Sequence, residues 1–481
     1  MEIFRIKDPF ILTIFGASGD LAKLKIFPAL FALAEQKRFP EKFIILGYAR
    51  TKMTDAAFRK EFSDAIQATI KGPMTEWQEN ILRGLLEHVF YFAGQYDNLK
   101  DFTAYKEHCD KLCHVSHPAR LAYFSVPPSL FEPIAENFAK IYDPKKEDIR
   151  LILEKPFGHD EASAMKLFHF LGQRFTEQQI YLLDHYLGKK AVRSLIPLRH
   201  MNRILNLMLK GREVANIQIS ALEPLGVENR IGYFNEVGTI KDMVQSHLLQ
   251  ILALTTMSIP VERNAERVQE EKTAILAALK FEASHDNISL GQYEGYRSQS
   301  AETKDSSTPT FVAAKLTINR ESWYGVPVFL RTGKKLNEKH TYLVIELKKF
   351  EFQKASHDPN RVIIELSPDE KIHIRLLDED GATARLGEIG VSESIACQGD
   401  FCLPEHGLLL LDVIRGEKMH FLSFAEILAS WRIVDQMIQA IHTQKIPVET
   451  YKSGTCGPES QKNLMKGTDF QWYHMDHHHA C

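Results

Sequence analysis

The first fifty residues contain the feature that most limits the possible folds: an apolar run, a glycine turn and a helical pattern in direct succession. The run Phe10–Phe15 is apolar with interspersed β-branched residues, as is typical of a central strand in a parallel sheet. Gly16 and Gly19 follow, and apolar residues then recur at helical spacing through Phe27 and Leu33. This order places a pyrophosphate on backbone N–H groups at a helix N-terminus. The spacing is G-x-x-G-x-x-A rather than G-x-G-x-x-G, so an ordinary tight turn stays an alternative.

The end of the next apolar run, Phe43–Gly47, indicates which dinucleotide would bind. NAD sites usually have an acidic residue at the end of this strand for the ribose 2′-hydroxyl, whereas NADP sites have an arginine nearby. Here Arg50, Thr51 and Lys52 follow the strand, and the first carboxylate is Asp55. A guanidinium suits a 2′-phosphate, so the sequence predicts NADP rather than NAD.

Strand-like runs continue to alternate with helical segments, which predicts a doubly wound parallel sheet. These runs are His88–Ala93, Leu121–Val126, Ile149–Leu153 and Ile180–Leu183. The second run ends directly before Pro127-Pro128. Soon after the third run, Lys155 precedes Pro156, and the bond between them is either cis or trans.

A polar cluster follows the last of these runs. Asp184, His185, Tyr186, Lys189 and Lys190 stand together directly after Ile180–Leu183. Ligands of α/β folds bind at the carboxyl ends of the strands. Imidazole and carboxylate suit proton transfer, and clustered lysines suit an anion. The cluster predicts a ligand site, with a merely solvated strand end as the alternative.

The second half of the chain changes character. Apolar residues alternate with polar ones from Val312 to Ile318, from Leu343 to Leu347 and from Ile372 to Leu376, which indicates an antiparallel sheet. The segment 238–257 has the pattern of a long helix that is interrupted by Asp242 and His247. A single histidine in such a helix is either a hydrogen-bonded core residue or a catalytic base.

Composition excludes several classes of function. The chain has 481 residues, enough for two domains, and a formal net charge of −3, which argues against nucleic acid as a partner. It contains no apolar run of membrane-spanning length and no signal-peptide pattern at its N-terminus. Six cysteines are few for this length and favour reduced thiols in the cytoplasm. We predict no metal site at two places rich in metal-ligand residue types. One is the cluster of Cys109, Cys113, His114 and His117, and the other is the histidine-rich C-terminus.

Together these segments resemble one family, the glucose-6-phosphate dehydrogenases, over most of the chain. The pair EKPFG and DHYLGK is the most specific part of the resemblance. The matching blocks are 16–23 (GASGDLAK), 47–50 (GYAR), 154–158 (EKPFG), 184–189 (DHYLGK), 232–234 (GYF), 242–250 (DMVQSHLLQ), 325–327 (GVP), 330–334 (LRTGK) and 431–433 (WRI).

The resemblance implies a fold and a reaction. The expected fold is a Rossmann-like α/β domain that binds NADP, residues 1–184, and an α+β domain, residues 185–481, with a large mostly antiparallel sheet that binds substrate and forms the dimer. The expected reaction is the first step of the oxidative pentose phosphate pathway. C1 of D-glucose 6-phosphate is oxidised to 6-phospho-D-glucono-1,5-lactone, with hydride transfer to NADP. A cytoplasmic homodimer or homotetramer is expected, without a metal.

The resemblance also implies the role of single residues. His247 is the expected general base, and Asp184 orients its imidazole. The expected cofactor contacts are Gly16, Ala17, Ser18, Gly19, Asp20, Leu21, Ala22, Lys23, Arg50, Tyr123 and Lys155. The expected substrate contacts are Lys155, His185, Tyr186, Lys189, Glu223, Asp242, Lys334 and Lys339.

Two alternatives share parts of these patterns. Sugar oxidoreductases of the glucose-fructose oxidoreductase type have a Glu-Lys-Pro motif but not the DHYLGK block paired with a helical D-x-x-x-x-H. A non-catalytic NADPH-binding regulator would be expected to lose Asp184 or His247, and both are present. The chain also has Val344 and Cys456 where animal members carry basic residues around a second, structural NADP, so the pattern is closer to bacterial members.

Overall fold

The chain divides into two compact units in the computed structural model, which describes residues 8–113, 115–282, 284–351, 358–368, 370–377, 383–384 and 403–474. The first unit comprises Met1–Gly158, Ala162–Gly188 and Gly399–Phe424. The second comprises His159–Glu161, Lys189–Gln398 and Ala425–Cys481. This division differs from a single boundary between residues 184 and 185, because the chain returns to the first unit after residue 398.

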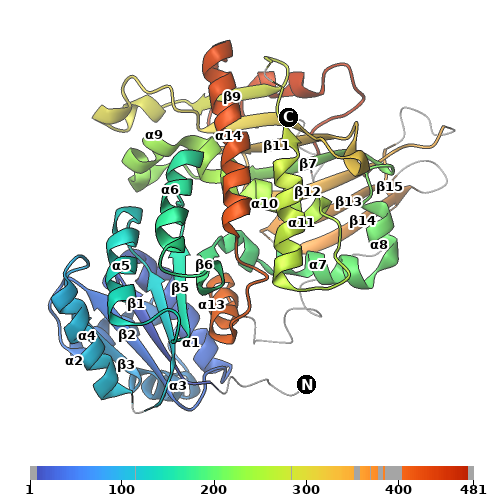
Figure 1. Cartoon of the computed structure of the whole chain (residues 1–481). Helices are drawn as coiled ribbons and strands as arrows, with labels where there is room; N and C mark the ends of the chain where they lie inside the picture. The colour runs from blue at the N-terminus through green and yellow to red at the C-terminus, as the bar shows by residue number, and fades with distance from the viewer. Residues whose placement is uncertain are drawn as a thin grey trace. The chain divides into compact units, whose positions relative to one another are not determined.

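The first unit is built on a six-stranded parallel sheet with the strand order β3-β2-β1-β4-β5-β6 (Figure 1). All its neighbouring strands are parallel. The predicted doubly wound sheet is therefore confirmed, and every predicted strand is present. The strands are β1 (Phe10–Phe15), β2 (Phe43–Ala49), β3 (Val89–Ala93), β4 (Ala119–Phe124), β5 (Ile149–Glu154) and β6 (Ile180–Leu183).

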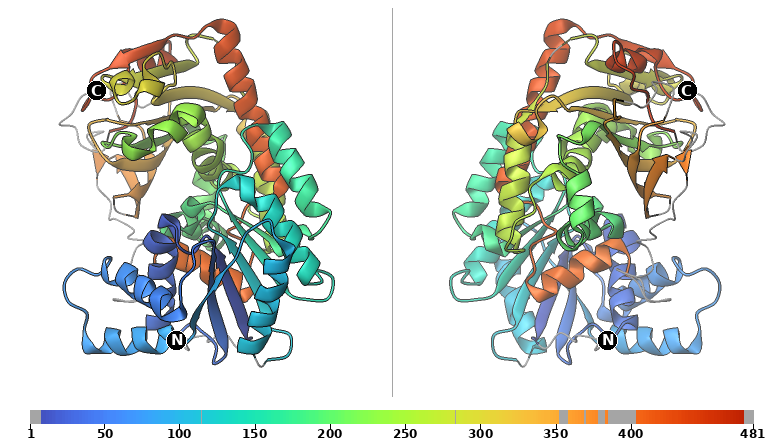
Figure 2. Two further views of the ribbon diagram at one scale, coloured as in Figure 1. Left: turned by 90° about the vertical axis from the view of Figure 1, so that its left-hand side faces the viewer. Right: turned by 90° about the vertical axis from the view of Figure 1, so that its right-hand side faces the viewer.

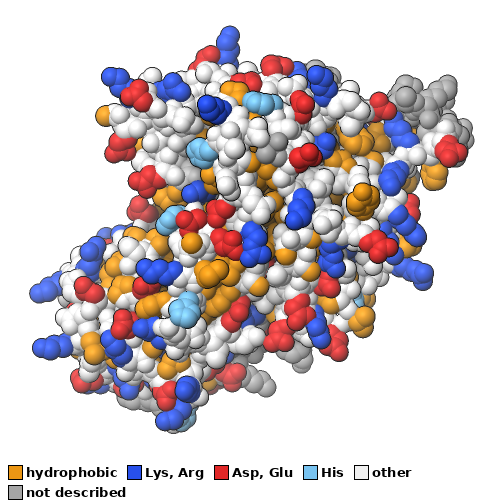
Figure 3. All heavy atoms as spheres, turned by 45° about the horizontal axis from the view of Figure 1, so that its top comes forward, with side chains coloured by type: hydrophobic (Ala, Val, Ile, Leu, Met, Phe, Trp, Pro, Cys, Tyr) orange, Lys and Arg blue, Asp and Glu red, His pale blue; other side chains and the backbone are white. Residues whose placement is uncertain are grey.

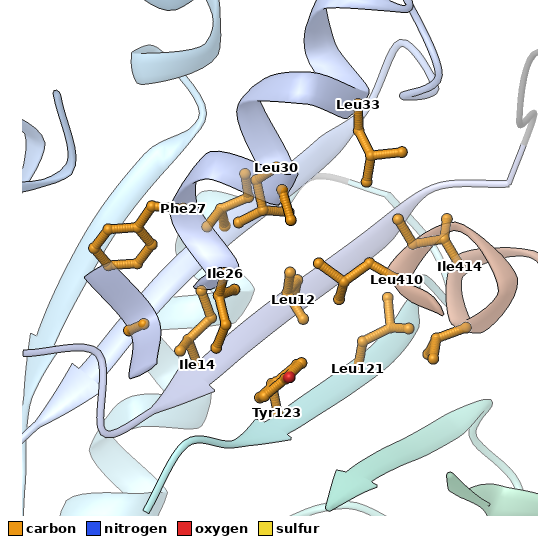
Figure 4. Close-up of a cluster of buried hydrophobic side chains, with 14 of the residues drawn as sticks. Leu12, Ile14, Ile26, Phe27, Leu30, Leu33, Leu121, Tyr123, Leu410 and Ile414 are labelled. Atoms are coloured by element: carbon orange, nitrogen blue, oxygen red, sulfur yellow. The ribbon is translucent and has the colours of Figure 1, made fainter. Parts of the chain in front are cut away.

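Helices cover both faces of this sheet (Figure 2). On one face, Leu12 and Ile14 of β1 point toward Phe27 and Leu30 of α1 and toward Leu410 of α13 (Figure 4). On the other face, Phe15 packs against Phe102 of α4 and Phe138 of α5. The main helices of the unit are the π-helical turn η1 (Ala22–Ile26), α1 (Phe27–Glu35), α2 (Asp55–Gln67), α3 (Glu76–Leu86), α4 (Leu99–Leu112), α5 (Phe131–Ile141), α6 (Glu161–Gly172) and α13 (Glu405–Arg415).

The second unit contains a mixed, mostly antiparallel sheet, as predicted. Its order is β15-β14-β13-β12-β7-β11-β10-β9-β16, with β8 paired to β10. Within this sheet, only the pairs β7–β11 and β9–β16 are parallel among its described strands. The strands are β7 (Val214–Leu222), β8 (Leu279–Lys280), β9 (Ile288–Tyr293), β10 (Phe311–Ile318), β11 (Pro327–Gly333), β12 (His340–Leu347), β13 (Arg361–Ser367), β14 (Lys371–Leu377), β15 (Thr383–Ala384) and β16 (Val448–Tyr451).

The long helix predicted over residues 238–257 is present with one interruption and one change of type. Gly238 has φ 67° and ψ 169°, so the chain bends there, at the end of α9 (Ile231–Thr239). A π-helix, η6 (Ile240–Leu248), follows and continues into α10 (Leu249–Thr256). The other main helices of this unit are α7 (Lys190–Met201), α8 (Arg203–Met208), α11 (Ala265–Ala277) and α14 (Phe424–Gln444).

Several smaller expectations are resolved as well. The Lys155–Pro156 bond is cis. Cys109 and Cys113 are free, whereas Cys456 is disulfide-bonded, which corrects the expectation of reduced thiols for that residue. In the described part of the chain, no helix is long and apolar enough to cross a membrane. Basic and acidic side chains are interspersed over the face in Figure 3, in keeping with the small net charge. His114 and the tail from residue 475 lie outside the described residues.

Candidate active site

The glycine turn after β1 has the geometry of a phosphate cradle. Gly16 adopts φ +85°, and a Cβ there would lie 2.1 Å from the carbonyl oxygen of Ser125, so only glycine fits. Its N–H donates to the carbonyl of Tyr48 at 2.8 Å, and the N–H of Gly19 donates to the carbonyl of Gly16 at 2.9 Å. Gly19 and Asp20 are exposed directly before η1 begins. These hydrogen bonds hold the turn in shape, and its exposed residues Gly19 and Asp20 lie just before a helix N-terminus, the kind of place where a pyrophosphate binds.

Arg50 lies beside this turn at the end of β2. Its side chain is exposed, and its guanidinium carbon lies 5.9 Å above the ring of Tyr96. Burial raises the pKa of the Tyr96 phenol, although Arg50 and the backbone of Gly16 oppose the shift. The sequence did not reveal Tyr96, because no motif or spacing joins it to the glycine turn. Lys23 pairs with Glu61 at 2.9 Å, which gives this predicted cofactor contact a partner within the fold.

The ends of β4 and β5 are joined through a carboxylate. The hydroxyl of Tyr123, which is fully buried, donates to Oε1 of Glu154. Burial and the Glu154 carboxylate raise the pKa of Tyr123 well above its usual range, so it stays a donor. Nε2 of His406 in α13 lies 3.6 Å from the same oxygen. Lys155 is half-buried directly after Glu154. His406 has no sequence signal, since it reaches this strand end only through the return of the chain.

Asp184 follows β6 as a fully buried carboxylate. Its Oδ1 accepts the N–H of Tyr186 at 3.0 Å, which fixes the turn η4 (His185–Gly188). His185 is half-buried, and its ring stacks on that of His406 with centroids 6.4 Å apart. Gly188 packs closely against α13, since a Cβ there would lie 2.8 Å from the carbonyl oxygen of Glu405. Residues 184–188 are therefore packed at the carboxyl end of β6, whereas the ligand-binding role of the cluster with Lys189 and Lys190 stays a prediction.

A buried lysine fixes the other end of β6. Lys418 donates to the carbonyl oxygens of Glu177 and Ile180, the latter at 2.7 Å. Burial lowers the pKa of Lys418 to about 8. The N–H of Leu422 donates to the carbonyl of Leu182 at 3.0 Å. The segment after α13 thus covers the open edge of β6, which would otherwise leave unpaired backbone groups.

In the second unit, two predicted sugar contacts form a pair. Glu223 directly follows β7 and Lys334 directly follows β11, and these two strands are neighbours. Nζ of Lys334 lies 2.5 Å from Oε2 of Glu223. The lysine side chain is 15% exposed and the glutamate 38% exposed, so the pair borders solvent. Lys339 is exposed just before β12.

Asp242 and His247 both lie on the π-helix η6. Five residues correspond to about 140° of rotation on an α-helix, whereas the i→i+5 bonding of a π-helix brings such residues toward one side. His247 is 4% exposed and Asp242 is half-buried. Burial and the Asp242 carboxylate raise the pKa of Tyr233. The second unit thus presents an imidazole and a carboxylate on η6, together with the phenol of Tyr233 from α9.

The predicted residues therefore fall into two sets. The cofactor contacts, Asp184, His185 and Tyr186 belong to the first unit. Lys189, Glu223, Asp242, His247, Lys334 and Lys339 belong to the second. The pairing of Asp184 with His247 stays a prediction, as do the individual roles of these side chains.

Comparison with known proteins identifies the family. The NAD binding domain of glucose-6-phosphate dehydrogenase matches residues 13–194, and its C-terminal domain matches residues 196–473. The cytoplasmic isoform of glucose-6-phosphate 1-dehydrogenase from Solanum tuberosum is 34% identical over 96% of this chain and 92% of its own length. The enzyme from Saccharomyces cerevisiae is 33% identical over 95% and 93%.

Solved structures agree with this assignment. A glucose-6-phosphate dehydrogenase in complex with glucose-6-phosphate has a TM-score of 0.87 at 30% identity, covering 98% of this chain and all of the other. The enzyme from Mycobacterium avium has a TM-score of 0.82 at 30% identity, covering 97% and 99%. A Gal80p mutant from Saccharomyces cerevisiae shares the fold alone, with a TM-score of 0.53 at 10% identity over 90% of this chain and 96% of its own. This chain therefore belongs to the glucose-6-phosphate dehydrogenase family.

Proposed function

We propose that this chain oxidises D-glucose 6-phosphate at C1 to 6-phospho-D-glucono-1,5-lactone, the first step of the oxidative pentose phosphate pathway. NADP, when bound, supplies the hydride acceptor for the hydrogen on C1. His247 takes the proton of the C1 hydroxyl, and Asp184 orients the imidazole and stabilises its protonated form. The observation that carries the proposal is the buried imidazole on the π-helical segment shared with Asp242.

The first unit fits NADP on its own geometry. Gly16 lets the turn pass against the carbonyl of Ser125, Gly19 and Asp20 are exposed just before the following helix, and Arg50 extends an exposed guanidinium. These residues would hold the pyrophosphate and the 2′-phosphate. Lys155, directly after β5, would border the cofactor, and the buried Tyr123 of β4 would support this strand end through its hydrogen bond to Glu154. We assign residues 1–184 to cofactor binding and residues 185–481 to substrate binding and dimerisation.

The remaining polar residues suit a sugar phosphate. His185, Tyr186 and Lys189 would bind the phosphate dianion, and charge-assisted contacts of this kind are strong and geometrically specific. Lys155, Glu223, Asp242, Lys334 and Lys339 would bind the sugar hydroxyls. The close Lys334–Glu223 pair presents a donor and an acceptor side by side, as a polyol requires. We expect the protein in the cytoplasm, because relatives described as cytoplasmic match over almost the whole chain. A homodimer or homotetramer is expected from the family resemblance alone.

The two alternative functions, a sugar oxidoreductase of the glucose-fructose oxidoreductase type and a non-catalytic NADPH-binding regulator, are less favoured. Proteins of known structure that share only the fold, such as Gal80p, have 10% identity, whereas dehydrogenases of this family have 30% or more.

NADPH formation measured by absorbance tests the proposal directly. We expect rapid reduction of NADP with glucose 6-phosphate and slow reduction with unphosphorylated glucose. Lys189→Ala should lower kcat/KM for glucose 6-phosphate by one to two decades, since a charge-assisted contact contributes roughly 1.5–3 kcal/mol. The value for glucose should hardly change. Lys190→Ala is the matched control at the next position.

Equal losses for both sugars in Lys189→Ala would remove this residue from phosphate recognition. No NADPH formation by the wild-type chain with glucose 6-phosphate would contradict the proposed function itself.

A further inference from the structure

The second unit contains a fully buried ion pair that the proposed reaction does not use. Nζ of Lys272 in α11 lies 2.8 Å from Oε2 of Glu426 in α14, and the two side chains are 1% and 0% exposed. Burying two charges is costly, and apolar residues of similar volume often give equal or greater stability. Stability alone therefore does not explain why a pair of charges occupies this place.

A third residue connects the pair to the helical segment that carries His247. Nζ of Lys272 also donates to Oε1 of Gln250 at 3.3 Å, and Gln250 is 1% exposed. Gln250 lies in α10, three residues after His247, in the helix that continues η6 without a break. Lys272 thus ties α11 and α14 to one side chain in the first turn after the proposed base.

The same helical segment is held at both ends. Arg199 donates to the carbonyl oxygens of Leu254 at 3.0 Å and Met257 at 2.9 Å, and the indole of Trp323 donates to that of Thr256 at 2.8 Å. These bonds satisfy carbonyl groups that a helix end leaves without partners. Near the start, Nζ of Lys241 lies 6.0 Å from the ring centre of Trp431 in α14. Between these ends, Gln250 accepts a hydrogen bond from the charged side chain of Lys272.

We infer that Lys272, paired with Glu426, is a positioning residue that fixes the rotation of the η6–α10 segment and thereby the direction of the His247 imidazole. The inference rests on the proposed role of His247. A one-residue slip of an α-helix turns each side chain by about 100°. A polar contact to Gln250 specifies one register, whereas an apolar contact at the same place would tolerate several.

Two variants test this inference without leaving a buried charge alone. Lys272→Met/Glu426→Leu removes both charges and keeps the volume, and Gln250→Met removes only the acceptor. We expect both to lower kcat for glucose 6-phosphate by roughly 10- to 100-fold, since a misplacement of about 1 Å costs up to about 10²-fold. KM for NADP should stay at the wild-type value, because the cofactor residues lie in the first unit. Arg267→Met, which removes an exposed ion pair with Glu270 on the same helix α11, should leave kcat unchanged.

A second readout does not depend on turnover. In protein with isotope-labelled histidines, the His247 signal is assigned by its loss in His247→Asn, and we expect Gln250→Met to shift it while Arg267→Met does not. Wild-type kcat together with an unmoved His247 signal in Gln250→Met would overturn the inference, even if the double variant fails to fold. A shifted signal in a chain that does not oxidise glucose 6-phosphate would support the positioning and contradict the proposed function.

Discussion

At the scale of single residues, replacing His247 distinguishes best between a catalytic base and a hydrogen-bonded core histidine. It is 4% exposed on the π-helix, where an imidazole can exchange a proton without competing water. His247→Asn should lower kcat for glucose 6-phosphate by roughly 10²–10⁴-fold, the usual contribution of general acid–base catalysis. KM for glucose 6-phosphate should change little, because the residue acts on the proton rather than on the phosphate. Steady-state kinetics beside His200→Asn, an exposed histidine of the same unit, gives the comparison.

A His247→Asn variant with kcat near the wild-type value would remove His247 from the base role. The histidine would then be a core residue, the alternative that the sequence left open.

Residues with a local motif were predictable, and residues without one were not. Gly16 could be predicted because its turn admits no side chain. Arg50 could be predicted because the residue after this strand contacts the ribose 2′-hydroxyl of NAD or the 2′-phosphate of NADP. Tyr96 lies beside Arg50, and His406 lies beside Glu154, through tertiary structure alone. No spacing in the sequence connects positions 154 and 406.

At the scale of elements, hydrophobic periodicity predicted the strands of the parallel sheet and a helix over residues 238–257, which the structure shows from 240 to 256. It could not reveal that η6 is a π-helix, because a shift of the backbone bond from i+4 to i+5 leaves the apolar pattern almost unchanged. Nor did it predict the bend at Gly238, which has a positive φ within an apparently continuous pattern. The π-helix contains the proposed base His247, and the bend at Gly238 lies just before this helix begins.

The pair of neighbouring strands β12 and β13 supports a prediction about pH. Nε2 of His340 lies 3.0 Å from Oε1 of Glu365, and Nδ1 lies 3.7 Å from Oε2 of Glu338. Burial alone would lower the pKa of His340, but the two carboxylates outweigh it and raise the pKa to about 9. His373 approaches the other oxygen of Glu365 at 3.5 Å. The charged imidazole therefore stabilises the folded state fully below about pH 6.5, its unfolded value, and this contribution is lost as the pH rises through 9.

The expected loss is at most roughly 3 kcal/mol of the free energy of unfolding, from about 1.4 kcal/mol per pKa unit. Urea unfolding at pH 6 and pH 9.5 measures it, with His340→Gln compared with wild type. The difference between the two proteins should shrink at the higher pH. A difference that is the same at both pH values would mean that folding does not shift the pKa of His340. His442→Gln, at an exposed site, controls for general effects of removing a histidine.

At the scale of the whole molecule, the sequence predicted two domains but not the path of the chain between them. Leu410 and Ile414 of α13 complete the core of the first unit, more than 200 residues after its last strand. The apolar pattern of α13 alone does not indicate which of the two units the helix belongs to. Its place is decided by packing against α1, which only the folded chain reveals (Figure 4).

The division into units leads to a prediction about cofactor binding. A ligand that binds only the folded state stabilises it by about 2.7 kcal/mol at a concentration of 100 Kd. With NADP, we expect added hydrogen-exchange protection to be greatest in β1, β2 and β4 of the first unit, which carry or border the glycine turn and Arg50. Arg50→Ala should weaken NADP binding at least about tenfold, and a tenfold change corresponds to about 1.4 kcal/mol. The added protection at the same NADP concentration should then fall to about half.

With NAD, which has no 2′-phosphate, wild type and Arg50→Ala should be protected equally. This contrast between the two cofactors separates recognition of the 2′-phosphate from a general role of Arg50 in the fold. Arg50 is exposed and contacts the ring of Tyr96, so its removal should not by itself unfold the unit. Equal losses of protection with both cofactors would show that Arg50 supports the pyrophosphate or the strand end, and the preference for NADP would then need another residue.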